Sequence, residues 1–246
     1  MTETMRSAAP APDAISSRPT RNWGAALKAL RRLLSDKEDT GQVCEIMRAL
    51  NGDANSRSYS RLLATQDGGR LAYEHVELAP LLMDDAWLNS FAPGTVGAAY
   101  RTFIRSENLS AEGLAEISRQ RAPRVEEAHP HAWFGRRTRD AHDIWHILSG
   151  YHRDGLGEAC LVAFSYAQTR ALGWALIAVG AGVRALREGS PAAVRAIWQG
   201  YRRGRAARWL QGEDYVRLLS EPLDAARRRL HITPPTLYEA LVKAAR

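Results

Sequence analysis

The chain has 246 residues, of which 45% are hydrophobic and 25% are charged. This composition is typical of a globular protein with a sizeable core, and it excludes fibrous and wholly disordered classes. The 34 basic and 27 acidic residues give a formal net charge of +7. That charge is compatible with an anionic membrane surface, a nucleic acid or a phosphorylated ligand, and by itself it selects none of them.

The first 20 residues are rich in alanine, proline and serine and lack the apolar core of a secretory signal. We therefore expect a disordered leader over residues 1–20 and a single domain over residues 21–246. Cys44 and Cys160 are far apart, so neither a disulfide framework nor a cysteine-type zinc site is expected, and a reducing compartment is the simplest interpretation. Since no run of 18 apolar residues occurs, no transmembrane helix is expected.

Hydrophobic residues recur with helical spacing along most of the chain, beginning with Trp23, Leu27 and Leu30. Alternating β-branched residues are rare, so the sequence predicts an all-α, single-domain helical bundle. Gly150 should end one helix, and Pro191 should open another, because proline is favoured in the first helical turn. Helices are expected over 23–34, 43–50, 100–104, 136–148, 158–187, from 191 onwards, over 218–230 and after 235, with polar breaks over 51–60 and 91–97.

The motif with the clearest chemistry is His142-Asp143-Ile-Trp-His146, followed after 11 residues by Glu158. On a helix His142 and His146 share one face, and Asp143 lies beside that face. On a continuous helix Glu158 would lie about 160° away from His142. Three glycines between His146 and Glu158 allow the chain to reverse, so that Glu158 opens a second helix facing the first. Two imidazoles and two carboxylates would then converge on one point.

Such a set of side chains suits a divalent metal ion. Two histidines and a carboxylate support zinc with an open coordination position, and they resemble the facial arrangement of non-haem iron. These ligands do not fix the metal; we expect zinc first, with iron, cobalt, manganese or magnesium as alternatives. A histidine pair on a helix also occurs with ordinary hydrogen bonds and no metal, and this alternative stays open.

Two classes of metal hydrolase have related motifs. Zinc peptidases carry His-Glu-x-x-His with the glutamate as general base, whereas Asp143 is one carbon shorter, which disfavours a peptidase. Phosphohydrolases with a His-Asp doublet need further ligands on other helices, and no other histidine of the chain shows supporting spacing.

The run from Arg137 to Gln168 closely resembles the Coq4 family of ubiquinone biosynthesis, whose hallmark is His-Asp-x-x-His followed after 11 residues by Glu. Residues 200–232 are similar to the C-terminal part of the family. Pro93–Gly97 with Tyr100 and Phe103 looks like its looser N-terminal motifs, although many positions depart there. The similarity covers roughly residues 40 to 232, and the leader has no counterpart.

This resemblance implies an all-α, Coq4-like fold with His142, Asp143, His146 and Glu158 as metal ligands. It implies a carbon–carbon lyase or oxidative decarboxylase acting on 4-hydroxy-3-methoxy-5-polyprenylbenzoate, with loss of the C1 carboxylate. The expected partners are a polyprenylated benzoquinone precursor, other ubiquinone-biosynthesis proteins and, peripherally, a membrane. The alternative is a non-catalytic, polyprenyl-lipid-binding organiser of the biosynthetic complex.

Further side chains are candidates for binding the substrate. Arg137 and Arg139 precede the motif and would steer an anionic head group, unless they belong to a solvated helix face. Small residues over 164–183 leave room either for close helix packing or for an isoprenoid tunnel, with Trp145 and Trp174 as wall residues.

The segment Arg195–Arg208 interleaves arginines with aromatic residues, which suits an anionic membrane interface, although such runs are often simple solvated faces. No nucleic-acid motif accompanies it, so we expect no nucleic-acid partner. We expect a homodimer. For a bacterial source, which the arginine-rich composition indicates, the expected location is cytoplasmic, at the inner face of the cell membrane. For a eukaryotic source it is the matrix side of the mitochondrial inner membrane.

Overall fold

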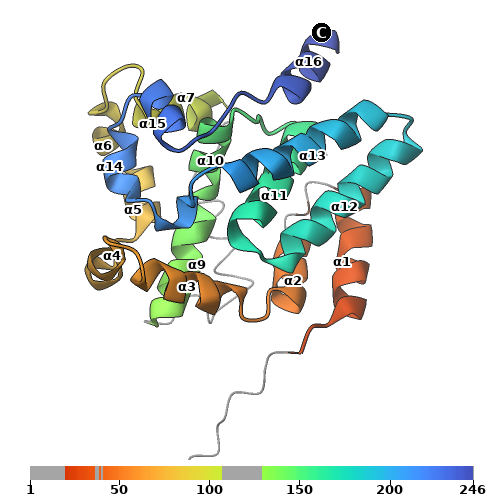
Figure 1. The fold of residues 1–246 in the computed structure, drawn as a ribbon, viewed down its shortest axis with the longest axis horizontal. Coiled ribbons are helices and arrows are strands. Elements are labelled where there is room, and N and C mark those ends of the chain that lie inside the picture. Colours follow the sequence, from red (N-terminus) through yellow and green to blue (C-terminus); the bar gives the residue numbers. More distant parts are fainter. Residues whose placement is uncertain (1–19, 37–38, 40, 107–128, 246) are drawn as a thin grey trace, which may run out of the picture.

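The computed structural model describes residues 20–36, 39, 41–106 and 129–245 (Figure 1). These residues form helices and no strand, apart from an isolated β-bridge between Thr95 and Pro222. The predicted all-α fold is thereby confirmed. The predicted leader lies outside the described residues, except for Thr20.

Short helices make up the first half of the chain and longer ones the centre of the second half. The first half contains α1 (Trp23–Ser35), α2 (Gly41–Leu50), α3 (Ala54–Leu63), α4 (Gly68–Glu74), α5 (Leu78–Met83), α6 (Asp85–Asn89) and α7 (Val96–Ser106). The second half contains α9 (Pro130–Asp140), α10 (His142–Ser149), α11 (Gly155–Thr169), α12 (Leu172–Arg187), α13 (Pro191–Ala206), the 3₁₀ turn η2 (Leu210–Gly212), α14 (Tyr215–Leu219), α15 (Leu223–Arg229) and α16 (Thr236–Ala244). None of these described helices is both long and apolar enough to cross a bilayer.

Helix α11 forms the centre of the core. Its residues Cys160, Leu161 and Phe164 are fully buried, as expected for a helix that is apolar around most of its circumference. Helices α10, α12 and α13 all pack against it. Gly200 and Gly204 of α13 lie so close to α11 that an added Cβ would collide with main-chain oxygen atoms of that helix. The backbones of α11 and α13 can therefore approach closely.

Several predicted helix boundaries are confirmed. Gly150 ends α10 in the left-handed conformation with φ of 77°, which glycine adopts without a steric penalty. Pro191 is the first residue of α13, and the last helix begins at Thr236. The N-terminal helix from Trp23 and the helix ending at Leu50 also form as expected.

Other boundaries differ from the prediction. The helix predicted over 158–187 is two helices, because Arg170 adopts a left-handed φ of 56° between α11 and α12. The helix predicted over 218–230 is likewise divided, at Ser220–Pro222, into α14 and α15. The break predicted over 51–60 is wrong, because α3 begins at Ala54; its small buried face packs on α4 and α9 despite a polar sequence.

The small residues of α12 serve close packing. An added Cβ on Gly173 would lie 2.5 Å from Met47 Sδ of α2, and one on Gly180 would lie 2.9 Å from Leu30 Cδ1 of α1. These contacts support the interpretation of α12 as a packed helix. Near its N-terminal end, Trp174 stacks on His142 of α10.

Candidate metal centre

The site is built where α10 ends and α11 begins. After Gly150 the chain turns, and the side chain of Asp154 caps α11 by accepting hydrogen bonds from the backbone N–H groups of Leu156 (3.1 Å) and Gly157 (3.0 Å). Such a cap satisfies donors that the first helical turn leaves free. Glu158 therefore stands in the first turn of α11, facing the histidines of α10, as the glycine-rich link predicted.

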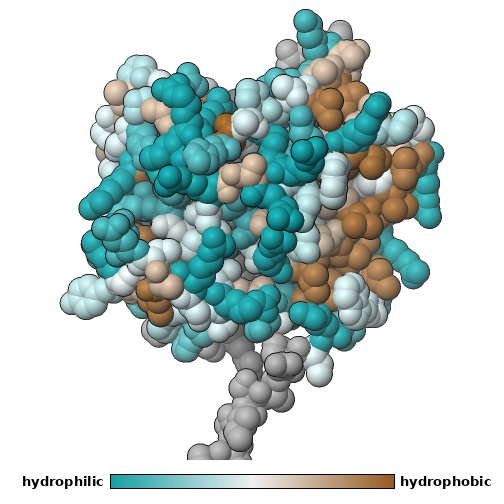
Figure 2. All heavy atoms as spheres, viewed as in Figure 1, coloured by the Kyte–Doolittle hydropathy of each residue, from teal (hydrophilic) through white to brown (hydrophobic). Residues whose placement is uncertain are grey.

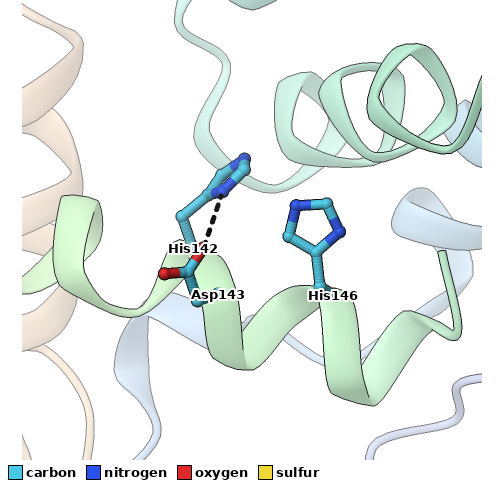
Figure 3. Close-up of side chains that lie close together, drawn as sticks. All are labelled: His142, Asp143 and His146. Carbon is cyan, nitrogen blue, oxygen red and sulfur yellow. Dashed lines mark ion pairs between the residues drawn. The ribbon is translucent and has the colours of Figure 1, made fainter. Parts of the chain in front are cut away.

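The side chains of His142, Asp143 and His146 converge above α10 (Figure 3). One ligand atom from each lies within 4.8 Å of the other two. His142 Nδ1 is 3.9 Å from Asp143 Oδ1, and the two imidazole rings are 5.1 Å apart between centroids. Glu158 is not one of these three, so the structure brings together three of the four predicted ligands; Glu158 lies beside them, with 3.4 Å between its Oε1 and His146 Nε2.

The tautomer of His146 follows from its surroundings. Its Nδ1 lies 2.9 Å from the carbonyl oxygen of Tyr151, which can only accept, so Nδ1 carries the proton and donates. In the neutral ring Nε2 then keeps a lone pair directed toward the cluster. A hydrogen bond from one ring nitrogen to a carbonyl oxygen typically orients a histidine whose other ring nitrogen binds a metal.

The Nε2 atoms of both His142 and His146 are buried and have no hydrogen-bond partner among the described residues. A buried polar atom without a partner destabilises the folded state, so two of them in one cluster need an explanation. A divalent cation, which accepts lone pairs from imidazole nitrogens and from carboxylate oxygens, fits this donor set.

Aromatic rings hold both imidazoles in place. Phe103 of α7 stacks on His146 at 5.5 Å between centroids, and Trp174 of α12 stacks on His142 at 5.8 Å. The site thus has side chains from four helices around it. Because the rings restrict rotation of both histidines, the cluster is preorganised for a ligand.

The charges of the cluster support one another. Burial alone would lower the pKa of His142, but the neighbouring carboxylate of Asp143, with the charge of Glu158, raises it above its ordinary value. Burial would raise the pKa of Asp143 and of Glu158, yet the histidines and Arg153 hold both carboxyl pKa values below their ordinary range. Both carboxylates are therefore ionised at neutral pH and available to a cation.

The structure separates the four predicted substrate-binding residues. Trp174 contacts His142, as described above. Trp145 lies in the core, where its Nε1–H donates to the hydroxyl of Tyr215 at 2.8 Å. Arg137 is 3% exposed, and its guanidinium donates to the carbonyl of Glu213 and lies over the ring of Tyr215.

Arg139 pairs with its neighbour Asp140 at 2.7 Å. The arginine that acts on the cluster is instead Arg153, whose Nε is 3.6 Å from Glu158 Oε1. Arg153 was not predicted from the sequence, because a loop has no periodicity from which to infer where a side chain points. The sequence indicated it only by its position in the link between the two helices of the motif.

Comparison with known proteins places the whole of this site within one family. Residues 15–236 match the family described as "Coenzyme Q (ubiquinone) biosynthesis protein Coq4". The mitochondrial ubiquinone biosynthesis protein coq4 of Pyrenophora tritici-repentis is 27% identical over 206 residues, covering 79% of this chain and 68% of the relative. The mitochondrial COQ4 homolog of Bos taurus is 27% identical over 205 residues, covering 80% of this chain and 74% of the relative.

A crystal structure from Nostoc punctiforme shares the fold, with a TM-score of 0.58 and 22% identity, over 87% of this chain and 100% of that chain. The family match extends the resemblance seen in the sequence at both ends, and at the N-terminal end it includes the last residues of the predicted leader. It also contains all four residues of the His-Asp-x-x-His…Glu motif. The chain therefore belongs to the Coq4 family of ubiquinone biosynthesis proteins.

Proposed function

We propose that this member of the Coq4 family is a metal-dependent enzyme that removes the C1 carboxylate of a polyprenyl hydroxybenzoate during ubiquinone biosynthesis. The observation that carries this proposal is the pair of buried Nε2 atoms, on His142 and His146, without hydrogen-bond partners and beside two ionised carboxylates. A structural role alone would not require such atoms to lack hydrogen bonds in a folded core.

His142, Asp143, His146 and Glu158 would hold the ion, with zinc favoured and iron, cobalt, manganese or magnesium as alternatives. A bound divalent cation supplies electrostatic stabilisation where negative charge develops. Decarboxylation breaks the bond between C1 and the carboxylate carbon, releases CO₂ and leaves the electron pair in the ring. A proton from water then replaces the carboxylate. In the oxidative variant, one dioxygen converts the 4-hydroxybenzoate to the benzoquinone, CO₂ and water.

The protein's own groups orient the substrate. Arg153 lies at the partly exposed side of the cluster, with 28% of its side chain accessible. A guanidinium matches a carboxylate in geometry and charge. We infer that Arg153 receives the substrate carboxylate and that Trp174, stacked on His142, flanks the ring.

Glu158→Gln is expected to lower the rate of decarboxylation at least about a hundredfold, because it removes one ionised ligand while keeping the shape of the side chain. The purified chain would be loaded in turn with zinc, iron, cobalt or manganese and given a short-chain prenylated hydroxybenzoate with and without oxygen. Mass spectrometry of the ring identifies the product. Release of CO₂ that requires both the metal and Glu158 supports the proposed decarboxylase activity. An oxygen atom added to the ring shows that the reaction is oxidative.

Arg153→Gln is expected to raise KM for the benzoate by about 10- to 100-fold, because it removes a charge-assisted hydrogen bond. Binding of a non-reactive benzoate, measured by calorimetry, should weaken by the same factor, whereas the matching phenol without a carboxylate should bind as before. Arg139→Gln is the matched control, since Arg139 pairs with Asp140 on α9, whereas Arg153 pairs with Glu158 of the site. An equal loss of affinity for the phenol would contradict a role in binding the carboxylate.

The alternative is a non-catalytic organiser that binds polyprenyl lipids and other ubiquinone-biosynthesis proteins. Tight prenyl-lipid binding with no turnover under any metal would favour it. In either role we expect a homodimer associated peripherally with a membrane, because a polyprenyl tail resides in lipid. That membrane is the mitochondrial inner membrane, on its matrix side, in a eukaryotic source. In a bacterial source it is the inner face of the cell membrane.

A further inference from the structure

Large apolar side chains are exposed on four helices that pack one on the next in the order α1, α12, α13 and α16. Figure 2 shows hydrophobic residues gathered along one side of the molecule, over the region where Figure 1 places α12. Val179 is 63% exposed and Trp198 is 60% exposed. We call this surface the apolar band; its members are Trp23, Leu27, Val179, Val183, Leu186, Trp198 and Leu237.

The apolar band is organised by helical periodicity. Val179, Val183 and Leu186 are spaced by four and three residues, so they lie on one face of α12. The opposite face of the same helix packs on α1, α2 and α11, where Ile177 and Gly180 are buried. A soluble surface rarely exposes so much contiguous apolar area unless another molecule covers it.

A groove with positive charge opens beside this band, between α13 and α16. It has a volume of about 530 Å³, and Trp198 and Leu237 contribute apolar walls. Arg195 and Arg202, seven residues apart and thus on the same face of α13, line it. Gln199 fixes the two helices together, since its side chain donates to Thr236 Oγ1 at 2.8 Å and accepts from Leu237 N at 3.0 Å.

Arg195 and Arg202 have no acidic partner among the described residues, whereas the third arginine of the groove, Arg203, is buried and donates to backbone carbonyl groups. Many other arginines of the chain form ion pairs. Arg195 and Arg202 are exposed, and α13 contains no aspartate or glutamate. Unpaired guanidinium groups favour a phosphate, which can accept several of their N–H donors at once.

We propose that the groove between α13 and α16 binds the phosphate headgroup of an anionic lipid, and that the apolar band then contacts the surface of that membrane. A freely soluble phosphate would not use the neighbouring Val179, Val183 and Trp198. Exposed tryptophan beside arginine is the composition found where proteins meet the lipid headgroup region.

A second copy of the chain fits this surface less well. A two-fold interface places the same patch on both partners, so the arginine-rich face of α13 would approach its own copy. Like charges brought together in this way oppose association. The choice of a membrane rests in part on the proposed function, since a polyprenyl substrate resides in lipid, but vesicle binding is measured without substrate or metal and therefore fails or succeeds independently.

The test is co-sedimentation of the full chain with phosphatidylcholine vesicles, with or without about 30% phosphatidylglycerol, at low salt. The unmodified protein should prefer the anionic vesicles. The double variant Arg195→Gln/Arg202→Gln should bind them about 30-fold more weakly, since each cation near an anionic surface contributes roughly fivefold. Arg217→Gln/Arg228→Gln, on α14 and α15, is the matched control; it removes the same charge far from α12 (Figure 1) and should bind like the unmodified protein.

Trp198→Ser tests the apolar part of the surface. It should weaken binding to both kinds of vesicle, and the loss should persist at high salt, which screens only the contribution of the arginines. Equal loss in the two double variants would overturn the proposal, because overall charge would then explain the binding. A dimer that Trp198→Ser converts to a monomer, with vesicle binding unchanged, would also overturn it and assign the surface to a second copy.

Discussion

Replacing His142 by alanine is expected to lower the affinity for zinc at least about a hundredfold while the protein stays folded. Loss of a residue that only supports a ligand typically costs 10- to 100-fold in metal affinity, so loss of a ligand should cost more. The side chain of His142 is 24% exposed, so its removal leaves no large sealed cavity. Competition with a chelator of known affinity measures the change, and circular dichroism checks the fold.

His152→Ala is the control for this experiment. His152 is an exposed histidine in the link between α10 and α11, close to the cluster in sequence, but its ring lies beside that of Tyr238, with 6.1 Å between centroids. It should bind zinc as the unmodified protein does. Full metal occupancy in both His142→Ala and Glu158→Ala would show that these side chains hold no ion.

Replacing Arg203 by methionine is expected to lower the free energy of unfolding by about 3 kcal/mol, because it leaves buried carbonyl groups without a hydrogen-bond donor. Arg203 is 5% exposed. Its Nη2 donates to the carbonyl of Ser149 at 2.8 Å and its Nε donates to the carbonyl of Thr233 at 2.8 Å. The guanidinium also lies 4.8 Å from the centroid of the Tyr151 ring. One buried cation thus joins α13, the end of α10 and the segment before α16.

Urea denaturation followed by circular dichroism measures this loss of stability. Methionine keeps most of the volume and flexibility of the arginine stem, so the change reports mainly the lost charge and hydrogen bonds. Arg202→Met is the matched control one position earlier; its side chain is exposed, and its unfolding midpoint should stay within the range usual for surface substitutions. An unchanged midpoint in Arg203→Met would show that water satisfies the carbonyls of Ser149 and Thr233 equally well.

The local part of the site follows from the sequence. The spacing of His142 and His146 places both imidazoles on one face of α10 because the helical repeat is 3.6 residues. Gly150 stops that helix and Asp154 caps the next one, so the reversal that brings Glu158 back is encoded within a few residues. The family resemblance and the all-α fold depend on the same short-range patterns, and both are confirmed.

The direction of each arginine does not follow from the sequence. Arg137 and Arg139 belong to the same helix just before the motif, yet Arg137 is buried against Tyr215 while Arg139 pairs with Asp140. Helical spacing gives the angle between the two side chains around the helix axis. It does not give the residues that each side chain contacts. The answer depends on Glu213 and Tyr215, which reach α9 only once the chain has folded.

The sequence by itself determined the class of fold, the family and the candidate metal ligands, because periodicity, helix ends and motif spacing are properties of neighbouring residues. Only the tertiary structure decided that α11 and α12 separate at Arg170, that Tyr151 fixes the proton of His146, and that Phe103 and Trp174 hold the imidazole rings. The physical reason is that each of these features depends on surfaces from distant parts of the chain, whose packing no local pattern records.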